Sequence, residues 1–498
     1  MNLNPRRPIF NRRPENNIYR IFLYAVLILA GLWVFYGVGR GDIKSIGDPT
    51  LTPTRAALSY TAEGDAHFTS GNLVAAISSY RRALELDPNN ASVLATMARI
   101  QTYNSSMKTV LDDRRAALTE ALNSINQAKA LAPDDSTVAA TRAFVLDWNA
   151  TPLISGDRAA ALLVEAEQEA VRALNLDNTN TLALAYYGEI LIDEQRNTQA
   201  EQNILRALDS GQNLMDVHRV YAYLLETQGL YNQAIAEYKK AIEIAPNLTF
   251  LYMRAGANYR TLAFGSTIKE QREALYANSL DYFDMAAKIN DRLGVKDPGP
   301  YISISKTYSQ TGDFYAAGRN VQKALEYDPS NPDVYGQLGI VFQRSRNFEG
   351  AIPALECAIK GCDAAKSCEA RGGCGPTEVG VAVKGMDLSL DSVVYYYSYV
   401  SNLAALSRPK DNKCGEARRV IQLIRDGGYE ADPVVKQILQ ENENICNMVG
   451  SGITVSSITA TPDSSTPRPG QPTTTSLPTS TSLPTLTRVP TLTSTPAP

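Results

Sequence analysis

The stretch Ala83-Leu84-Glu85-Leu86-Asp87-Pro88 decides the fold, because related stretches return along the chain. They run from Ala128 to Pro133, from Ala241 to Pro246 and from Ala324 to Pro329. Each joins a run of mostly good helix formers to a proline, which cannot continue a helix. The recurrence predicts a chain built from repeated helical units.

Residues upstream of Pro88 indicate how one unit would pack. Gly64 and Ala76 are small enough for two antiparallel helices to approach closely, and the ring of Tyr80 would fill the space between neighbouring units. This spacing resembles the tetratricopeptide repeat, a helix–turn–helix unit of about 34 residues. The resemblance implies an all-α superhelical solenoid of about eight units over residues 56–360.

The distances between the closing positions of the units vary. Pro88, Pro133 and Asn178 lie 45 residues apart, whereas Asn178, Gln212 and Pro246 lie 34 residues apart, and Asp291 follows Pro246 by 45 residues again. Three units therefore carry about 11 extra residues each, either as helices that are about three turns longer or as loops between helices. The extra residues are placed at 105–115, 149–157 and 264–272.

The repeat pattern weakens after residue 360. Residues 361–390 form an insertion rich in Cys and Gly that lacks helical periodicity. Residues 391–449 are predicted to form a degenerate repeat and a capping helix, which a solenoid needs because its last apolar face is otherwise exposed. The predicted helices span residues 393–406, 415–425 and 433–449.

An uncharged apolar run covers residues 21–39. At about 1.5 Å per residue it matches the ~30 Å hydrocarbon core of a bilayer. Residues 1–20 contain five arginines and one acid, so the positive-inside rule predicts a basic cytoplasmic segment there, with the rest of the chain across the membrane. A cleaved signal peptide and a buried core helix are the alternatives. Bulky aromatics in residues 32–36, where cleavage needs small side chains, favour an uncleaved signal-anchor.

Two segments are predicted to lack a fold of their own. Residues 40–55 form a linker, and residues 450–498 form a Ser/Thr/Pro-rich tail in which proline recurs every six residues from Pro478 to Pro496. Such a tail cannot bury enough apolar surface to offset its ordering entropy, so we expect disorder. Its composition is typical of stalks with O-linked sugar and equally of unmodified tails.

All six cysteines follow residue 356. An even number beyond a membrane anchor favours disulfides, with a zinc site and free thiols as alternatives. Two of them open one predicted helix and close the antiparallel helix that follows, so we expect Cys414 to pair with Cys446. The remaining four allow three connectivities, which stay open. These four are Cys357, Cys362, Cys368 and Cys374.

Tetratricopeptide arrays bind peptides or partner helices on a concave face, which the first helix of each unit lines. The resemblance implies such a groove here, with mixed charge and an aromatic side chain at intervals. A solvated helix face is the alternative for each position. The implied groove residues are Asp65, Phe68, Glu189, Ile192, Arg219, Tyr223, Glu226, Met253, Arg260, Lys306, Ser309, Ile340 and Gln343.

Composition and motifs narrow the function. No basic cluster follows the N-terminus, so nucleic acid is not an expected partner. His67 and His218 are the only histidines, and nucleotide, hydrolase and zinc-protease motifs are missing, so we expect no catalytic residue, metal, cofactor or small-molecule substrate. We predict a non-enzymatic, membrane-anchored scaffold for proteins or peptides outside the cytoplasm. The alternatives are a glycan-bearing surface component and an accessory subunit that positions an envelope transferase.

Overall fold

The structure is a computed structural model that describes residues 18–40, 56–375 and 379–451. The chain divides into two units, one ending at Ala56 and the other beginning at Ala57. Most of the predicted basic segment, linker and tail lies outside the described residues, at 1–17, 41–55 and 452–498.

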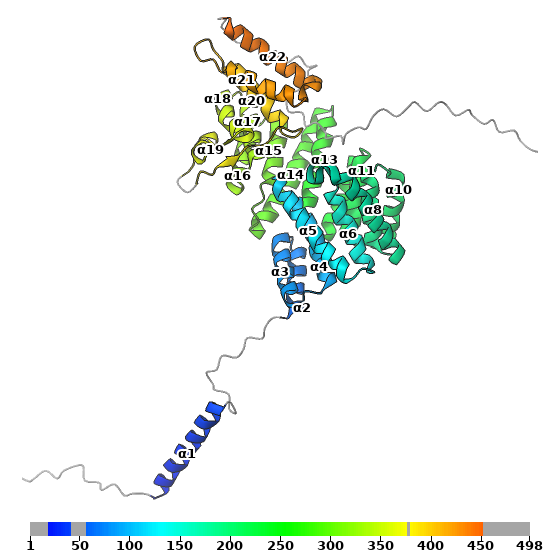
Figure 1. Ribbon diagram of the computed structural model, residues 1–498, viewed down its shortest axis with the longest axis vertical. Helices are drawn as coiled ribbons and strands as arrows, with labels where there is room; N and C mark the ends of the chain where they lie inside the picture. Colours follow the sequence, from blue (N-terminus) through cyan, green and yellow to red (C-terminus); the bar gives the residue numbers. More distant parts are fainter. Residues whose placement is uncertain (1–17, 41–55, 376–378, 452–498) are drawn as a thin grey trace, which may run out of the picture. The chain divides into compact units, whose positions relative to one another are not determined.

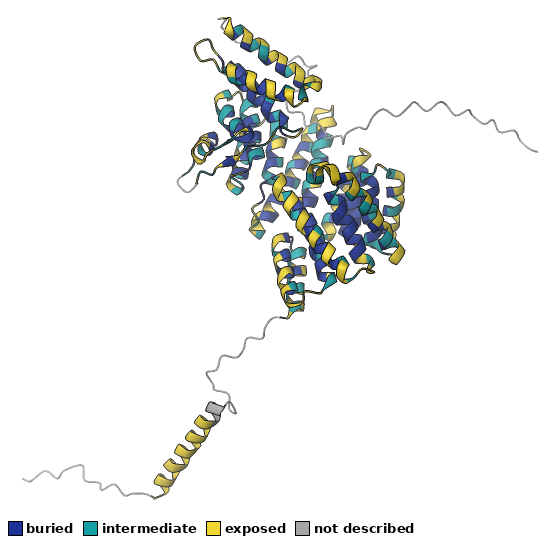
Figure 2. Cartoon of the chain, viewed as in Figure 1, coloured by how far each residue is buried: buried dark blue, intermediate teal, exposed yellow. Residues whose placement is uncertain are grey.

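The first unit contains helix α1 (Ile18–Arg40). Its stretch Ile18–Tyr36 has a mean hydropathy of 2.1, and none of these residues is buried, as Figure 2 shows. By length and composition it is the one helix among the described residues that could cross a membrane.

The second unit is an array of antiparallel helix pairs (Figure 1). The first helices of successive pairs contact one another, for example α6 with α9 and α9 with α11, so they form the inner face of the array. We call them inner helices. They are α2 (Ala57–Thr69), α4 (Ala91–Ser105), α6 (Ser136–Asn149), α9 (Thr181–Asp193), α11 (Met215–Thr227), α13 (Thr249–Gly265), α15 (Gly299–Thr311) and α17 (Pro332–Arg344).

The second helix of each pair packs mainly on its own inner helix, and we call these outer helices. The extra residues of three units lie largely in longer outer helices of 21, 18 and 25 residues, against 12–15 in the others, and partly in loops. The outer helices are α3 (Leu73–Leu86), α5 (Leu111–Leu131), α8 (Ala159–Leu176), α10 (Asn197–Gly211), α12 (Tyr231–Ile244), α14 (Lys269–Leu293), α16 (Phe314–Tyr327) and α18 (Phe348–Ile359), with α7 (Pro152–Ser155) and the 3-10 turn η1 (Gly156–Arg158) before α8.

Close contact within a pair depends on glycine. A Cβ atom on Gly64 of α2 would lie only 2.8 Å from the ring of Tyr80 on α3. The predicted close approach is therefore present, but Tyr80 packs on the inner helix of its own pair, where its hydroxyl donates to Asp65 Oδ1 at 2.5 Å. Gly256 and Phe283 repeat this contact between α13 and α14.

Ala234 of α12 tests this packing, because its side chain is completely buried. Ala234→Trp should lower the free energy of unfolding by ~1–3 kcal/mol or more, since an indole cannot fit without moving the inner helix. Ala236→Trp, at an exposed position of the same helix, is the matched control. Chemical denaturation of both variants measures the difference, and equal stabilities would contradict the close packing.

The beginning of the array contacts its middle. The Nδ2 atom of Asn247 donates to the carbonyl of Thr69 at 3.2 Å, and the rings of Tyr103 and Phe250 stack with centroids 4.9 Å apart. Gly71 has a φ of +85°, and a Cβ there would lie 2.0 Å from the carbonyl oxygen of Asn247. Helices α2 to α4 therefore close onto the α11–α13 region.

The end of the array differs from the other pairs. The bounds of α20, α21 and α22 agree within one residue with the helices predicted for the degenerate repeat and the cap. Helix α21 begins one residue earlier than predicted, at Cys414. The insertion was expected to lack helix, but residues Ala364–Ala370 form one there because Asp363 caps its N-terminus. The elements are β1 (Gly361–Cys362), α19 (Ala364–Ala370), β2 (Val383–Lys384), α20 (Val393–Leu406), α21 (Cys414–Asp426), the 3-10 turn η2 (Tyr429–Ala431) and α22 (Pro433–Gly450), with β1 and β2 antiparallel.

Candidate functional site

Aromatic side chains from four inner helices fill the inner face of the closed part of the array. The rings of Phe144 and Tyr186 stack at 4.5 Å, and Tyr103 lies 5.2 Å from Phe144. Trp148 meets both Tyr103 and Phe144 edge-on. Phe250 completes the cluster on the far side of Tyr103. Tyr103, Phe144 and Tyr186 are completely buried, so the centre of this face is a packed core.

A buried aspartate links opposite sides of this core. Asp216 of α11 accepts hydrogen bonds from Arg99 and Tyr103 of α4 and, at 2.8 Å, from the hydroxyl of Tyr186. Burial alone would raise the pKa of Asp216, but the charges of Arg99 and Arg219 and these hydrogen bonds lower it to about 2. Asp216 is therefore ionised at neutral pH, and its bonds hold α4 against α11.

Two predicted groove residues pair with each other inside the same core. The Nη1 and Nη2 atoms of Arg219 donate to the two carboxylate oxygens of Glu189 at 2.7 and 2.6 Å. Glu189 is 4% exposed and Arg219 is 6% exposed. The guanidinium also lies 5.5 Å from the ring centroids of Tyr103 and Phe144, within cation–π distance. This pair consequently stabilises the inner face and offers a ligand little free surface.

A second group of acids lies beside this pair with fewer partners. Asp147 is the third residue from the end of α6, and Asp193 is the last residue of α9. The Oδ1 atom of Asp147 is buried and has no hydrogen-bond partner among the described residues. Burial, followed by the charges of Asp193 and Glu189, raises the pKa of Asp147 well above its ordinary range. We call Asp147 and Asp193 the acid pair.

The other predicted groove residues lie at several depths. Ile192 is buried, the hydroxyl of Tyr223 donates to Asp193 at 2.7 Å, and Glu226 accepts from Arg254 and Asn258. The remaining ones are exposed or half-buried. These are Asp65, Phe68, Met253, Arg260, Lys306, Ser309, Ile340 and Gln343.

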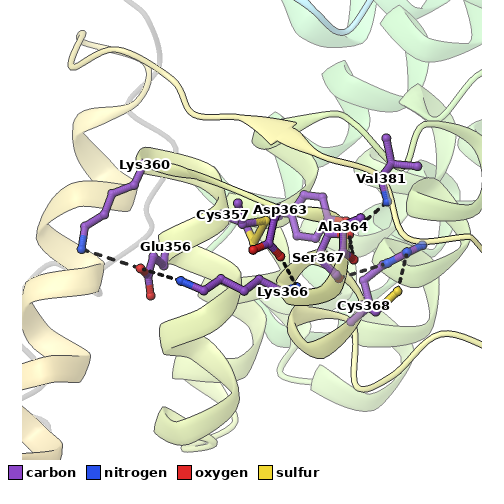
Figure 3. The surroundings of a disulfide bond; sticks show 12 residues. Glu356, Cys357, Lys360, Asp363, Ala364, Lys366, Ser367, Cys368 and Val381 are labelled. Atoms are coloured by element: carbon purple, nitrogen blue, oxygen red, sulfur yellow. Dashed lines mark hydrogen bonds and ion pairs between the residues drawn. A yellow bond between two sulfur atoms is a disulfide. The ribbon is translucent and has the colours of Figure 1, made fainter.

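The cysteines form three disulfides. Cys414 of α21 is bonded to Cys446 of α22, with Cα atoms 5.4 Å apart. The other two bonds are local, Cys357–Cys362 and Cys368–Cys374. The first of these lines a cavity of about 310 Å³ between α18 and α19. Figure 3 shows Glu356 there between Lys360 and Lys366, with Nζ–Oε1 distances of 4.0 and 3.9 Å.

Sequence models of the tetratricopeptide repeat match residues 57–90, 220–248 and 299–331. The first and last of these ranges coincide with the pairs α2–α3 and α15–α16, and the second covers the end of α11 and all of α12. The chain contains tetratricopeptide repeats.

Solved structures, among them two tetratricopeptide repeat proteins, are similar to this chain at low identity. One from Thermus thermophilus is 19% identical over 41% of this chain and 98% of that chain, with a TM-score of 0.34. One from Parabacteroides merdae is 17% identical over 57% and 98%, with a TM-score of 0.32. Human IFIT1, solved as a dimer with PPP-AAAA, is 14% identical over 80% and 90%, with a TM-score of 0.45. No curated protein matches the chain.

Repeat positions alone did not reveal the acid pair or the aromatic core. Asp147, Trp148 and Phe144 belong to a unit that matches the repeat pattern poorly, so no groove position was assigned in α6. One signal was available: Asp147 and Asp193 are acids near helix C-termini, where the helix dipole disfavours negative charge. Acids in such positions call for a partner that supplies positive charge.

Asp193 makes the stability of these tetratricopeptide repeats depend on pH. Burial raises its pKa to about 6 from 3.8, although Tyr223 hydrogen-bonds to it. Because the folded chain then holds the proton more tightly than the unfolded chain, stability falls as pH rises from about 4 to about 6. Asp193→Asn removes this loss and should raise the free energy of unfolding by about 1–3 kcal/mol at pH 8.

Urea denaturation at pH 8 and pH 4 measures this effect, and the gain of Asp193→Asn should vanish at pH 4. Asp209→Asn, an exposed site on α10, is the control and should change stability by less than about 0.5 kcal/mol at either pH. A gain at pH 4 as large as that at pH 8 would contradict a charge effect.

Proposed function

We propose that this chain is a membrane-anchored, non-enzymatic scaffold whose repeats bind a partner protein outside the cytoplasm. The observation that carries the proposal is the inner face of the array. Its closed part holds the buried Asp147 and the half-buried Asp193 without a cation of their own, and its later helices α15 and α17 offer the exposed Lys306 and the half-buried Gln343. Repeats of this kind present such a face to protein segments, which supports a binding role.

Helix α1 supports the anchor. Its apolar stretch has the length of a membrane span, and the arginines ahead of it favour a cytoplasmic N-terminus. The three disulfides favour the same orientation, because disulfides persist in oxidising compartments and are rare in the cytosol. The arginines and the disulfides therefore both support the proposal that the repeat array lies outside the cytoplasm.

A reporter enzyme that is active only outside the cytoplasm tests this orientation. Fused after Pro498, it should be active, and fused ahead of Met1 it should be inactive. Activity of the second fusion alone would reverse the topology and remove the proposed location of the scaffold.

Peptide mapping without reduction tests the disulfides in protein from its native membrane. We expect one crosslinked peptide that joins Cys414 to Cys446, and local pairs within residues 357–374. Six thiols that react with an alkylating agent before reduction would contradict both the pairing and the oxidising compartment.

Co-purification from native membranes tests the binding role. Lys306→Glu reverses a charge on an inner helix, and Leu205→Glu places the same charge on the exposed side of outer helix α10. We expect a protein that co-purifies with the wild type and with Leu205→Glu but is reduced with Lys306→Glu. Equal recovery with all three proteins would remove the inner face from the proposal.

A further inference from the structure

The ionised form of the acid pair is electrostatically unfavourable in the folded chain. Asp147 is 2% exposed, and its Oδ1 atom is buried without a hydrogen bond among the described residues. A buried carboxylate without a partner costs several kcal/mol in general. Its position and that of Asp193 near helix C-termini add a further unfavourable interaction, because the dipole is negative there.

The cations around the acid pair already have partners. Arg219 is bonded to Glu189, Arg254 to Glu226, and Arg196 to Glu167 and Glu194. Arg99, on the opposite side of the aromatic core, is bonded to Asp216. Every one of these bases has at least one acid of its own, so none is left over for Asp147 and Asp193. With Asp193 ionised, the net charge of this group of side chains is therefore negative.

The surroundings of the pair suit an organic cation. Among the described residues, no three His, Cys, Asp or Glu side chains are grouped as ligands of a metal ion. Tyr223 donates a hydrogen bond to Asp193, and the half-buried Trp148 donates one to Glu189. Aromatic faces beside carboxylates accommodate the aliphatic stem and the charged head of a basic side chain.

We propose that the acid pair receives one basic side chain, a lysine ammonium or an arginine guanidinium, from an extended segment of the partner protein. This inference rests on the function proposed above and specifies its partner. The incoming cation bonds to Asp193, which is partly accessible, and favours the ionised form of Asp147, whose buried Oδ1 atom has no hydrogen-bond partner among the described residues. Glu189 and Arg219 stay paired and hold α9 and α11 in place around the site.

Affinity should also depend on pH, in the opposite direction to stability. The groups that act on Asp147 of α6 and Asp193 of α9 are Glu189 of α9, Glu194 directly after it, and Arg219 and Tyr223 of α11, and Arg254 of α13 lies near Tyr223. Protonation of Asp193 removes the negative charge that attracts the cation. Binding should therefore weaken as pH falls below about 6, which is the pKa of Asp193 without a ligand.

Selection of random linear dodecapeptides on the full chain in nanodiscs provides the probe. We expect the selected peptides to share one Lys or Arg. Replacing that residue by norleucine should weaken binding to the wild type about tenfold or more, since charge-assisted hydrogen bonds are lost. The same replacement should have little effect on the double variant D147N/D193N, which circular dichroism shows to be folded if its helix content is unchanged. Asp209→Asn is the control and should behave like the wild type.

The outcomes separate this inference from the proposed function. Selected peptides that lack a basic residue, or an equal norleucine effect on the wild type and on D147N/D193N, would overturn the inference and leave peptide binding intact. Failure to select any peptide above empty nanodiscs would overturn the proposed function as well. The inference is supported if the norleucine replacement weakens binding to the wild type but not to D147N/D193N.

Discussion

Arg219→Ala is expected to lower the free energy of unfolding by about 3–5 kcal/mol. The substitution leaves Glu189 as a buried carboxylate with no cation, close to Asp147 and Asp193. It also removes the cation–π contacts with Tyr103 and Phe144. Chemical denaturation of the full chain in detergent, followed by circular dichroism, measures the loss.

A neutral replacement of the whole pair distinguishes charge from packing. The double variant Arg219→Met with Glu189→Gln removes both charges and keeps similar volumes, so it should recover a large part of the lost stability. Arg206→Ala, at an exposed position of α10, should cost less than about 0.5 kcal/mol. A double variant as unstable as Arg219→Ala would mean that the buried charge is not the cause.

Phe144→Ala is expected to have a similar effect, about 3–5 kcal/mol. Phe144 is fully buried and contacts Tyr186, Tyr103 and Trp148 with ring centroids 4.5, 5.2 and 5.5 Å away. Truncation leaves a cavity between α4, α6 and α9, which cannot collapse because the array is closed by Arg99 and Asp216.

Phe264→Ala provides the comparison, because Phe264 on α13 is 47% exposed. It removes the same atoms from a position with little packing, so its cost should be much smaller. Thermal or urea denaturation of both variants tests the expectation. Similar losses for the two would contradict the description of the inner face as a packed core.

The helical pairs could be predicted because their signals are local. Small residues such as Gly64 and Ala234, and a proline such as Pro88 at the end of a unit, report on contacts within one pair or between neighbours. The role of Tyr80 was predicted less well. Its ring packs on the inner helix of its own pair, which depends on a side-chain direction that spacing does not determine.

The closure of the array could not be predicted. Arg99 and Asp216 are 117 residues apart, and Thr69 and Asn247 are 178 apart. The curvature that brings them together accumulates from small rotations at each pair, and the three longer units change it further. Repeat spacing therefore indicated a groove along all inner helices, whereas the closed part has its centre filled.

In the candidate site, too, the helix that carries each residue could be predicted, but the contacts of its side chain could not. Glu189, Arg219 and Tyr223 were each assigned to the inner helices by repeat position, and each lies there. Their pairing, and hence their burial, follows from the curvature of the array. Asp147 was not assigned, since its unit departs from the repeat pattern and a single acid on a helix is ordinarily solvated.

Photo-crosslinking in native membranes tests most directly whether the inner face binds a partner. Benzoyl-phenylalanine is placed at Lys306 of α15 and Gln343 of α17, both accessible, and at Leu205 of outer helix α10, which is 45% exposed. We predict that the two inner positions give adducts with the same partner protein, identified by mass spectrometry, and that Leu205 gives none. An adduct from Leu205 alone, or none from any position, would contradict the scaffold described above.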